Sequence, residues 1–367
     1  MSNKLFIDFH VLQTVPPSCI NRDDTGSPKT AQYGGVQRAR VSSQCWKHAM
    51  RQMFKDNFNE AELGVRTKKI VDMVAKKIRA IDATKDELEA KKLAVKAITS
   101  AKVQIEEKKK PDEPEAKALF FMTTKQAENL AKLILENDSP SAKEAQAALN
   151  KGYGIDVALF GRMVADDPSL NTDASAQVAH SISTHRVDNE FDFYTAVDDC
   201  APEDNAGAGM MGTIEFNSAT LYRYATLAVH ELNKQIDDSK AMAKVIQEFA
   251  RAFIASMPTG KQNTFANQTL PNAVLVNLRI DQPINLVGAF ETPIQNKGNG
   301  FVKGSCEALA RHAQEIYDSF ATAPEKTYVV GAALQGLGEQ VNLQELLDSL
   351  WIETIERFGS EVLFNEA

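Results

Sequence analysis

Residues 21–51 read NRDDTGSPKTAQYGGVQRARVSSQCWKHAMR, and the prediction of the fold starts from this stretch. The pair Gly34–Gly35 allows a tight turn. Arg38 and Arg40 lie two residues apart, so on an extended chain both side chains leave the same face. The pair Ser42–Ser43 offers N-caps for a following helix. The stretch therefore predicts a strand that carries two arginines and runs directly into a helix.

The predicted helix has an apolar stripe and a basic face. The apolar stripe consists of Trp46, Ala49, Met50, Met53 and Phe54. The basic face consists of Gln44, Lys47, His48 and Arg51. Such a face is often an ordinary solvated helix surface. Here the two strand arginines and Lys29 of the preceding loop favour a phosphate-binding surface instead, because a helix N-terminus also attracts anions.

The distribution of charge agrees with a local anion site. The chain of 367 residues carries a net charge of −8, which argues against diffuse nucleic-acid binding over its whole surface. Residues 1–54, by contrast, carry a net charge of +4. A polyanion is therefore expected to lie against this N-terminal segment.

Composition also bounds the class of protein. Hydrophobic residues make up 43% and charged residues 25% of the chain, as in ordinary globular proteins. No stretch of uncharged apolar residues is long enough to cross a membrane, and the N-terminus has no signal-peptide pattern. The four cysteines lie far apart and without metal-ligand spacing. We expect a cytoplasmic protein with reduced thiols, no metal, no cofactor and no contact with membranes.

The order of predicted elements favours an α+β fold with helices on one face of the sheet. Residues 4–13 predict a central strand, because both of its faces carry apolar side chains. Residues 58–150 are rich in Ala, Lys and Glu and predict an inserted helical lobe. Residues 154–164 predict a strand and residues 174–184 a helix. Residues 239–256 predict an amphipathic helix and residues 342–358 a final helix, capped by Asn342. No glycine-rich nucleotide-binding motif is present in the sequence.

A long β-hairpin is predicted between Val187 and Phe216, with a glycine-rich turn. Its aromatic and methionine side chains suit stacking on bases or wedging between them. They equally suit a small satellite core beneath the hairpin. The candidates are Phe193, Tyr194, Met210 and Met211. Lys261, in a short polar loop after Pro258, is a weaker candidate for a phosphate contact.

A catalytic alternative stays open at this point. Asp23 and Asp24 lie beside Arg22, near the proposed polyanion site, and paired acids of this kind can cut a phosphodiester. Turn and cap roles explain most adjacent acids in the chain. The sequence therefore leaves a nuclease that uses Asp23 or Asp24 as the alternative to a non-catalytic binding protein.

Five segments, in this order, resemble the CasC family, the backbone subunit of the type I-E CRISPR Cascade complex. The segments are HVLQTVPPSCINRDDTGSPK (residues 10–29, continuing to Arg51), GIDVALFGRM (154–163), VDNEFDFYTAVDD (187–199), EFNSATLYRYA (215–225) and PTGKQNTFA (258–266). The resemblance implies an RRM-like (ferredoxin-like) palm, an inserted helical fingers lobe and a protruding β-hairpin thumb. The implied boundaries are 1–57, 151–187 and 217–367 for the palm, 58–150 for the fingers and 188–216 for the thumb.

The resemblance also implies a function. Copies of the chain would stack head to tail along a CRISPR RNA with other Cascade subunits, kink the RNA at regular intervals and present it to target DNA. The implied RNA-binding residues are Arg22, Lys29, Arg38, Arg40, Ser42, Gln44, Lys47, His48, Arg51, Met163 and Lys261. The implied thumb wedge at the kink is Phe193, Tyr194 and Met211, together with Met163. His48 stands where the resemblance implies a basic residue, so its charge near neutral pH depends on protonation.

Overall fold

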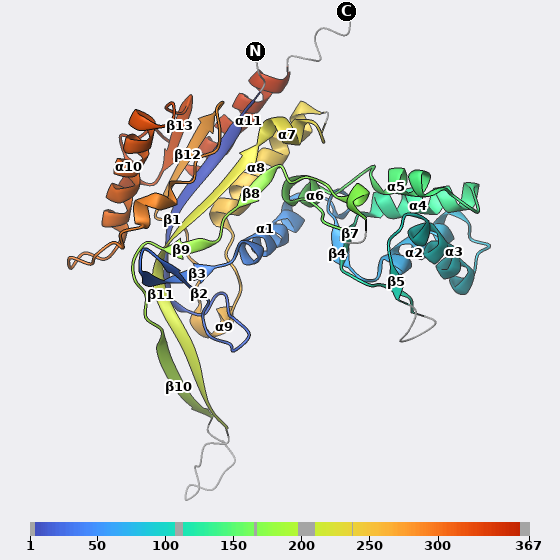
Figure 1. The fold of residues 1–367 in the computed structure, drawn as a ribbon, viewed down its shortest axis with the longest axis horizontal. Coiled ribbons are helices and arrows are strands. Elements are labelled where there is room, and N and C mark those ends of the chain that lie inside the picture. Colours follow the sequence, from blue (N-terminus) through green and yellow to red (C-terminus); the bar gives the residue numbers. More distant parts are fainter. Residues whose placement is uncertain (1–3, 107–112, 165–166, 197–209, 237, 360–367) are drawn as a thin grey trace, which may run out of the picture. The chain divides into compact units, whose positions relative to one another are not determined.

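The computed structural model describes residues 4–106, 113–164, 167–196, 210–236 and 238–359 (Figure 1). The chain forms two compact units, Met1–Met53 with Gln177–Ala367, and Phe54–Ala176. The predicted division into palm, fingers and thumb at residues 58, 151, 188 and 217 stays a prediction. Within the described residues, none of the helices combines the length and the apolar composition needed to cross a bilayer.

The first unit is built on one large sheet (Figure 1). Along its main path the strands follow the order β14-β13-β12-β1-β11-β9-β3-β2, and β8 and β10 pair with β11. The strands are β1 (Phe6–Ser18), β2 (Thr30–Tyr33), β3 (Val36–Val41), β8 (Ala176–Val178), β9 (Ser181–Ser183), β10 (Glu190–Ala196), β11 (Met210–Ala228), β12 (Ala273–Arg279), β13 (Lys326–Val330) and β14 (Glu339–Gln340).

Strand β1 lies at the centre, antiparallel to both β11 and β12, so the central strand predicted from residues 4–13 is confirmed. On one face, Phe9 packs against Phe249 of α8 (Ser239–Ala255), with ring centroids 5.7 Å apart. On the other face, Leu12 shares a core with Leu309 of α10 (Val302–Ser319). The prediction of helices on one face only was wrong. Strand β1 carries apolar side chains on both faces of the sheet, so helices pack against both faces.

The remaining elements of the first unit are mostly short. Helix α11 packs against α8, and Asn342 begins it with a capping box to Glu345, as its sequence predicts. These elements are α1 (Ser43–Asn57), α7 (Val229–Asn233), α9 (Gln262–Phe265), η4 (Leu286–Phe290), η5 (Ala332–Leu334) and α11 (Leu343–Phe358).

The second unit is mainly helical, as its composition predicts. Helices α2, α3 and α4 pack closely because alanines such as Ala90, Ala94 and Ala97 line their contacts. Its helices are η1 (Glu60–Glu62), α2 (Ile70–Ile81), α3 (Glu87–Ser100), α4 (Thr124–Glu136), α5 (Ala142–Leu149), α6 (Ile155–Phe160) and η2 (Pro168–Leu170). Its strands form two short pairs, β4 (Val65–Thr67) with β7 (Phe120–Met122), and β5 (Ile105–Glu106) with β6 (Glu115–Ala116).

Two predicted elements were wrong. Residues 154–164 contain the helix α6, not a strand, and Gly161 ends it at a φ of 76° that favours glycine. Residues 174–184 contain strands β8 and β9, not a helix. Strand β9 pairs on both sides, Ile182 with Tyr222 of β11 and with Arg40 of β3. This pairing outweighs the helical preference of the alanines around it.

Candidate nucleic-acid interface

Helix α1 begins at a fixed point. The Cys45 N–H donates to Ser42 Oγ at 3.3 Å, and the Ser42 N–H donates to Asn21 Oδ1 at 2.9 Å. The side chain of Trp46 is fully buried, and its Nε1–H donates to Ser181 Oγ of β9 at 2.9 Å. These bonds confirm the predicted cap. Because Ser42 is itself buried, its hydroxyl lies at the start of the helix and not on the open surface.

The predicted basic face of α1 lies on its outer side, since Trp46 faces the sheet. Gln44 and His48 are exposed, while Lys47 and Arg51 are half-buried. Burial lowers the pKa of Lys47 from its ordinary value. The His48 ring lies one turn from Gln52, whose Nε2 is 3.4 Å from His48 Nε2. The sequence-based assignment of these residues to one face therefore holds in the structure.

A cleft of about 550 Å³ lies beside this face, and we call it the α1 cleft. Three segments of the first unit line it: the loop after β1, helix α1 and the segment after α8. The lining residues are Ile20–Gly26, Cys45, His48, Ala49, Gln52 and Met257–Gly260. A Cβ on Gly260 would lie 2.3 Å from the Ile20 carbonyl oxygen, so only glycine lets the two loops approach this closely.

Cations from separate segments converge at the α1 cleft. Arg22 is exposed at its rim, and Lys261, half-buried, follows Gly260 directly. Burial raises the pKa of the Cys19 thiol, and the charges of Arg22 and Lys261 oppose that rise, so both cations lie near it. Lys29 acts in the same way on the half-buried thiol of Cys45. The chain thus gathers Arg22, Lys29 and Lys261 around the start of α1.

The two strand arginines behave differently from one another. Arg40 is half-buried, donates from Nε to the Thr30 carbonyl at 3.1 Å and lies 3.2 Å from His180 Nδ1. Arg38 is completely buried. Its guanidinium donates to the carbonyl oxygens of Tyr33, Ser183, Phe290 and Glu291. The assignment of Arg38 to RNA phosphates is corrected here: this side chain joins β3 to the segment after η4 and has no exposed surface.

The hairpin of β10 and β11 presents an apolar stripe on one face. Cross-strand pairing puts Met211 opposite Thr195, so it shares a face with Phe193 and Phe191. These three side chains are 64–67% exposed, which excludes the satellite core for them. Sequence analysis did not select Phe191, although its spacing of two from Phe193 indicates the shared face.

Tyr194, also predicted to belong to the wedge, lies on the opposite face of the hairpin. It is paired with Gly212 and covers that glycine, because a Cβ there would lie 2.5 Å from the tyrosine hydroxyl. Residues 197–209, which contain the predicted glycine-rich turn, and the side chain of Met210 lie outside the described residues.

Met163 belongs to the second unit and is 87% exposed. Its neighbour Arg162 is buried and holds the backbone there: its N–H donates to the Thr172 carbonyl at 3.0 Å, and the Thr172 N–H donates back at 2.9 Å. The Arg162 guanidinium also donates from Nε to the Leu170 carbonyl at 2.9 Å. A large apolar side chain is therefore held in solvent by a well-anchored loop.

One acid of the pair in the cleft loop, Asp23, has a local role. Asp23 Oδ1 accepts hydrogen bonds from the Thr25 hydroxyl at 2.7 Å, the Thr25 N–H at 2.9 Å and the Ser27 N–H at 3.0 Å. These bonds, led by that of the hydroxyl, lower the pKa of Asp23. Across the described residues, no three His, Cys, Asp or Glu side chains are grouped to hold a metal ion.

The sequence of this chain can be compared with those of known protein families. The sequence profile of a family described as CT1975-like protein matches residues 7–351. The chain belongs to the CT1975-like protein family. No curated protein sequence matches this CT1975-like protein.

Two solved structures resemble this CT1975-like protein over nearly its whole length. One, titled "CRISPR RNA-guided surveillance complex, pre-nicking", has 32% sequence identity and a TM-score of 0.84, covering 95% of this chain and all of the other. A second, titled "CRISPR RNA-guided surveillance complex", has 27% identity and a TM-score of 0.72, covering 94% and 99%. The mixed α+β architecture described above is thus shared with subunits of such complexes.

Proposed function

We propose that this protein is a non-catalytic backbone subunit that binds CRISPR RNA in a type I-E Cascade complex. The observation that carries the proposal is the α1 cleft, where cations from two separate segments surround a capped helix N-terminus. The likeness to two CRISPR RNA-guided complexes over the whole chain supports the identity of the ligand. The protein is then a structural component of antiviral defence.

The chemistry of the cleft suits a ligand of any base sequence. Arg22, Lys47 and Arg51 neutralise phosphates, and Gln44 donates to phosphate or sugar oxygens. None of these contacts distinguishes one base from another. A subunit that carries many different guides needs this property, since pairing with target DNA then reads the sequence while the protein sets the geometry.

The hairpin supplies the second part of the proposal. We infer that it is the thumb, which projects from an RRM-like palm, and that its stripe of Phe191, Phe193 and Met211 wedges between bases and kinks the RNA. Unstacking a step costs about a few kcal/mol, which burial of the exposed apolar stripe and phosphate contacts offset. Further copies of the chain along the RNA, and other Cascade subunits at its ends, complete the assembly.

A nuclease is the weaker candidate. Asp23 is held by its own loop and has a lowered pKa, so it makes a poor general base. We expect the assembled complex to leave complementary RNA intact in the presence of magnesium. Periodic cuts that disappear in Asp24→Ala would instead establish the nuclease.

The binding role is tested by replacing Lys47 and Arg51 together with alanine. We expect weaker binding of single-stranded RNA, about equally for all sequences, and a slope of log affinity against log salt that is shallower by about 1.4. The measurement is RNA affinity across a salt series for several unrelated sequences. Lys303→Ala with Arg311→Ala, two exposed cations on α10, is the matched control and should leave affinity and slope unchanged. Loss of affinity for only one RNA sequence would contradict the proposal.

A further inference from the structure

Arg223, on β11, is a buried cation beneath helix α1. It is 1% exposed, and the face of its guanidinium lies 3.8 Å from the ring centroid of Trp46 on α1. It donates from Nη1 to the Gln13 side-chain oxygen and from Nη2 to the Phe253 carbonyl, while its buried Nε has no hydrogen-bond partner. Among the described residues, no Asp or Glu forms an ion pair with it.

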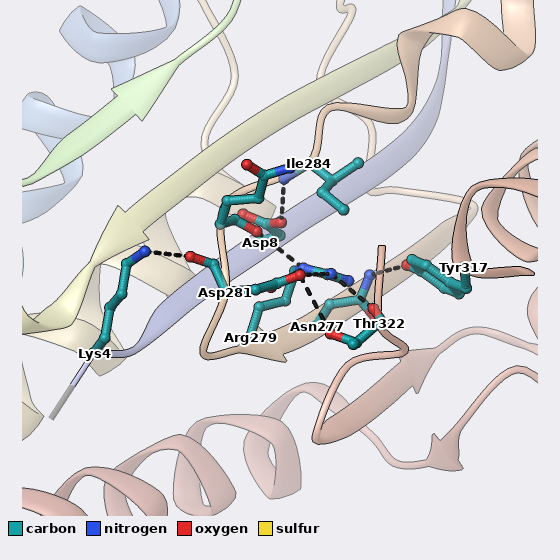
Figure 2. Close-up of polar contacts among 9 residues, drawn as sticks. Lys4, Asp8, Asn277, Arg279, Asp281, Ile284, Tyr317 and Thr322 are labelled. Atoms are coloured by element: carbon teal, nitrogen blue, oxygen red, sulfur yellow. Dashed lines mark hydrogen bonds and ion pairs between the residues drawn. The ribbon is translucent and has the colours of Figure 1, made fainter. Parts of the chain in front are cut away.

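The other two fully buried arginines of the first unit differ from Arg223: Arg279 has a counter-charge, and each guanidinium nitrogen of Arg38 donates to a carbonyl oxygen. Arg279, equally buried, forms a bidentate pair with Asp281, with Nη2 to Oδ2 at 2.7 Å and Nε to Oδ1 at 3.0 Å (Figure 2). Arg38 has four carbonyl acceptors. Of these three side chains, Arg223 alone lacks both a counter-charge and a full set of acceptors, an arrangement that destabilises the folded protein.

Both walls of the α1 cleft rest on this side chain. One wall is α1, and Arg223 stacks on its inward-facing Trp46. The other wall begins at Met257, just after Phe253, whose carbonyl Arg223 holds. Gln13, which accepts the second Arg223 bond, also donates to Met257 Sδ at 3.1 Å and to the Thr269 carbonyl at 2.8 Å. One guanidinium therefore fixes α1 and the segment that carries Lys261.

The charge of Arg223 lies across helix α1 from the basic face. Trp46 and His48 differ by about 200° around the helix, so Arg223 lies under the inner face of α1 while the basic residues line the outer face. A charge buried in protein is screened less by salt than a surface charge. Its field adds to that of the helix N-terminus at the place where phosphates are proposed to bind.

We propose that Arg223 is a positioning residue for polyanion binding, which sets the two walls of the α1 cleft and draws its counter-charge from the ribose-phosphate strand bound there. The inference rests on the proposed function and adds to it a buried residue that positions the binding site. Binding of RNA then stabilises the folded protein partly by compensating Arg223.

The test compares Arg223→Met, Arg223→Lys and the matched buried control Arg279→Met. For each, the melting temperature of the full chain is measured with and without an unstructured RNA oligomer, together with RNA affinity per folded protein. We expect Arg223→Met to keep or raise the melting temperature without RNA, because it removes an uncompensated charge. It should bind RNA about tenfold more weakly, and RNA should raise its melting temperature by less than it raises that of wild type. Arg223→Lys should stay within about threefold of the wild-type affinity.

Arg279→Met should behave in the opposite way. It leaves Asp281 without its partner, so we expect a lower melting temperature without RNA but an affinity within twofold of wild type. The inference is overturned if Arg223→Met binds RNA as tightly as wild type. If it does not fold, a folded Arg223→Lys that loses tenfold or more overturns the charge-based role. Should Lys47→Ala with Arg51→Ala also bind normally, the proposed function itself fails.

Discussion

At the scale of single residues, two buried groups of β1 titrate in opposing ways. Asp8 is fully buried and accepts a hydrogen bond from the Ile284 N–H (Figure 2). It also accepts one from the Tyr224 hydroxyl, yet burial raises its pKa from 3.8 to about 6. His10, two residues on, lies 2.9 Å from the Tyr222 hydroxyl, and burial lowers its pKa from 6.5 to about 3. Both groups are therefore neutral in the folded protein over part of the acid range.

These shifts have opposite consequences for stability. The folded state binds the Asp8 proton more tightly than the unfolded state, so the Asp8 contribution to stability rises as pH falls from about 6 to 3.8. The unfolded state binds the His10 proton more tightly, so the His10 contribution falls as pH falls from 6.5 towards 3. Between about pH 4 and 6 the two contributions largely cancel.

We predict that His10→Asn removes this cancellation. Relative to wild type, the free energy of unfolding of the variant should rise on acidification from pH 6 to pH 4, by at most about 1.4 kcal/mol per pH unit. Asp8→Asn should show the reverse trend relative to wild type. The measurement is urea denaturation at pH 4, 5, 6 and 7, and parallel profiles for all three proteins would sink the prediction.

Residue spacing alone does not predict which arginines are buried and which lie on the surface. The alternation of side chains in β3 correctly places Arg38 and Arg40 on the same face of the strand. It does not indicate which residues supply carbonyl acceptors to Arg38. Those acceptors come from Ser183, Phe290 and Glu291, more than 140 residues away in the chain. Arg223 was missed for the same reason, since its partners Gln13, Trp46 and Phe253 are distant in sequence.

At the scale of elements, substitutions on the two faces of the hairpin can be compared for their effects on stability and on RNA unstacking. We predict that Phe193→Ala with Met211→Ala leaves the melting temperature unchanged, because both side chains are about two-thirds exposed. The variant should unstack RNA less than wild type. The measurement is the fluorescence of 2-aminopurine placed along the RNA, which rises on unstacking.

Tyr194→Ala is the control from the opposite face of the hairpin. It uncovers Gly212 and should reduce the order of the hairpin itself. Undiminished unstacking in the Phe193 and Met211 variant would exclude the stripe as the wedge.

Helices and strands were predicted correctly where the segment is long and periodic, and wrongly where it is short or is defined by pairing with distant strands. Long periodic segments such as α8 and α11 were predicted within a residue or two of their bounds. Residues 154–164 and 174–184 failed because short apolar runs do not distinguish a helical turn from a strand. Strand β9 is defined by its neighbours β3 and β11, and the chain itself holds no local signal for that pairing.

At the scale of the whole molecule, the proposed function requires copies of the chain to gather on one RNA. The chain carries −8 overall, which opposes association of free copies, while its first 54 residues carry +4 and attract a polyanion. A head-to-tail contact that does not close into a ring produces a filament, whose length the RNA then limits. The repulsion follows from the net charge of the chain, and the stacking follows from the proposed function.

We predict that assembly grows stepwise with RNA length. The purified protein, mixed with unstructured RNAs of increasing length, should form particles whose mass rises in steps of one chain plus a constant length of RNA, and no particles of that kind without RNA. The measurement is the mass of individual particles in solution. Lys47→Ala with Arg51→Ala should lower the fraction of filled steps without changing the step size, because the spacing is set by protein–protein contact and the occupancy by phosphate binding. A single mass at every RNA length would show instead a monomer that binds RNA without stacking, and would remove the filament from the proposal while leaving the α1 cleft as its binding site.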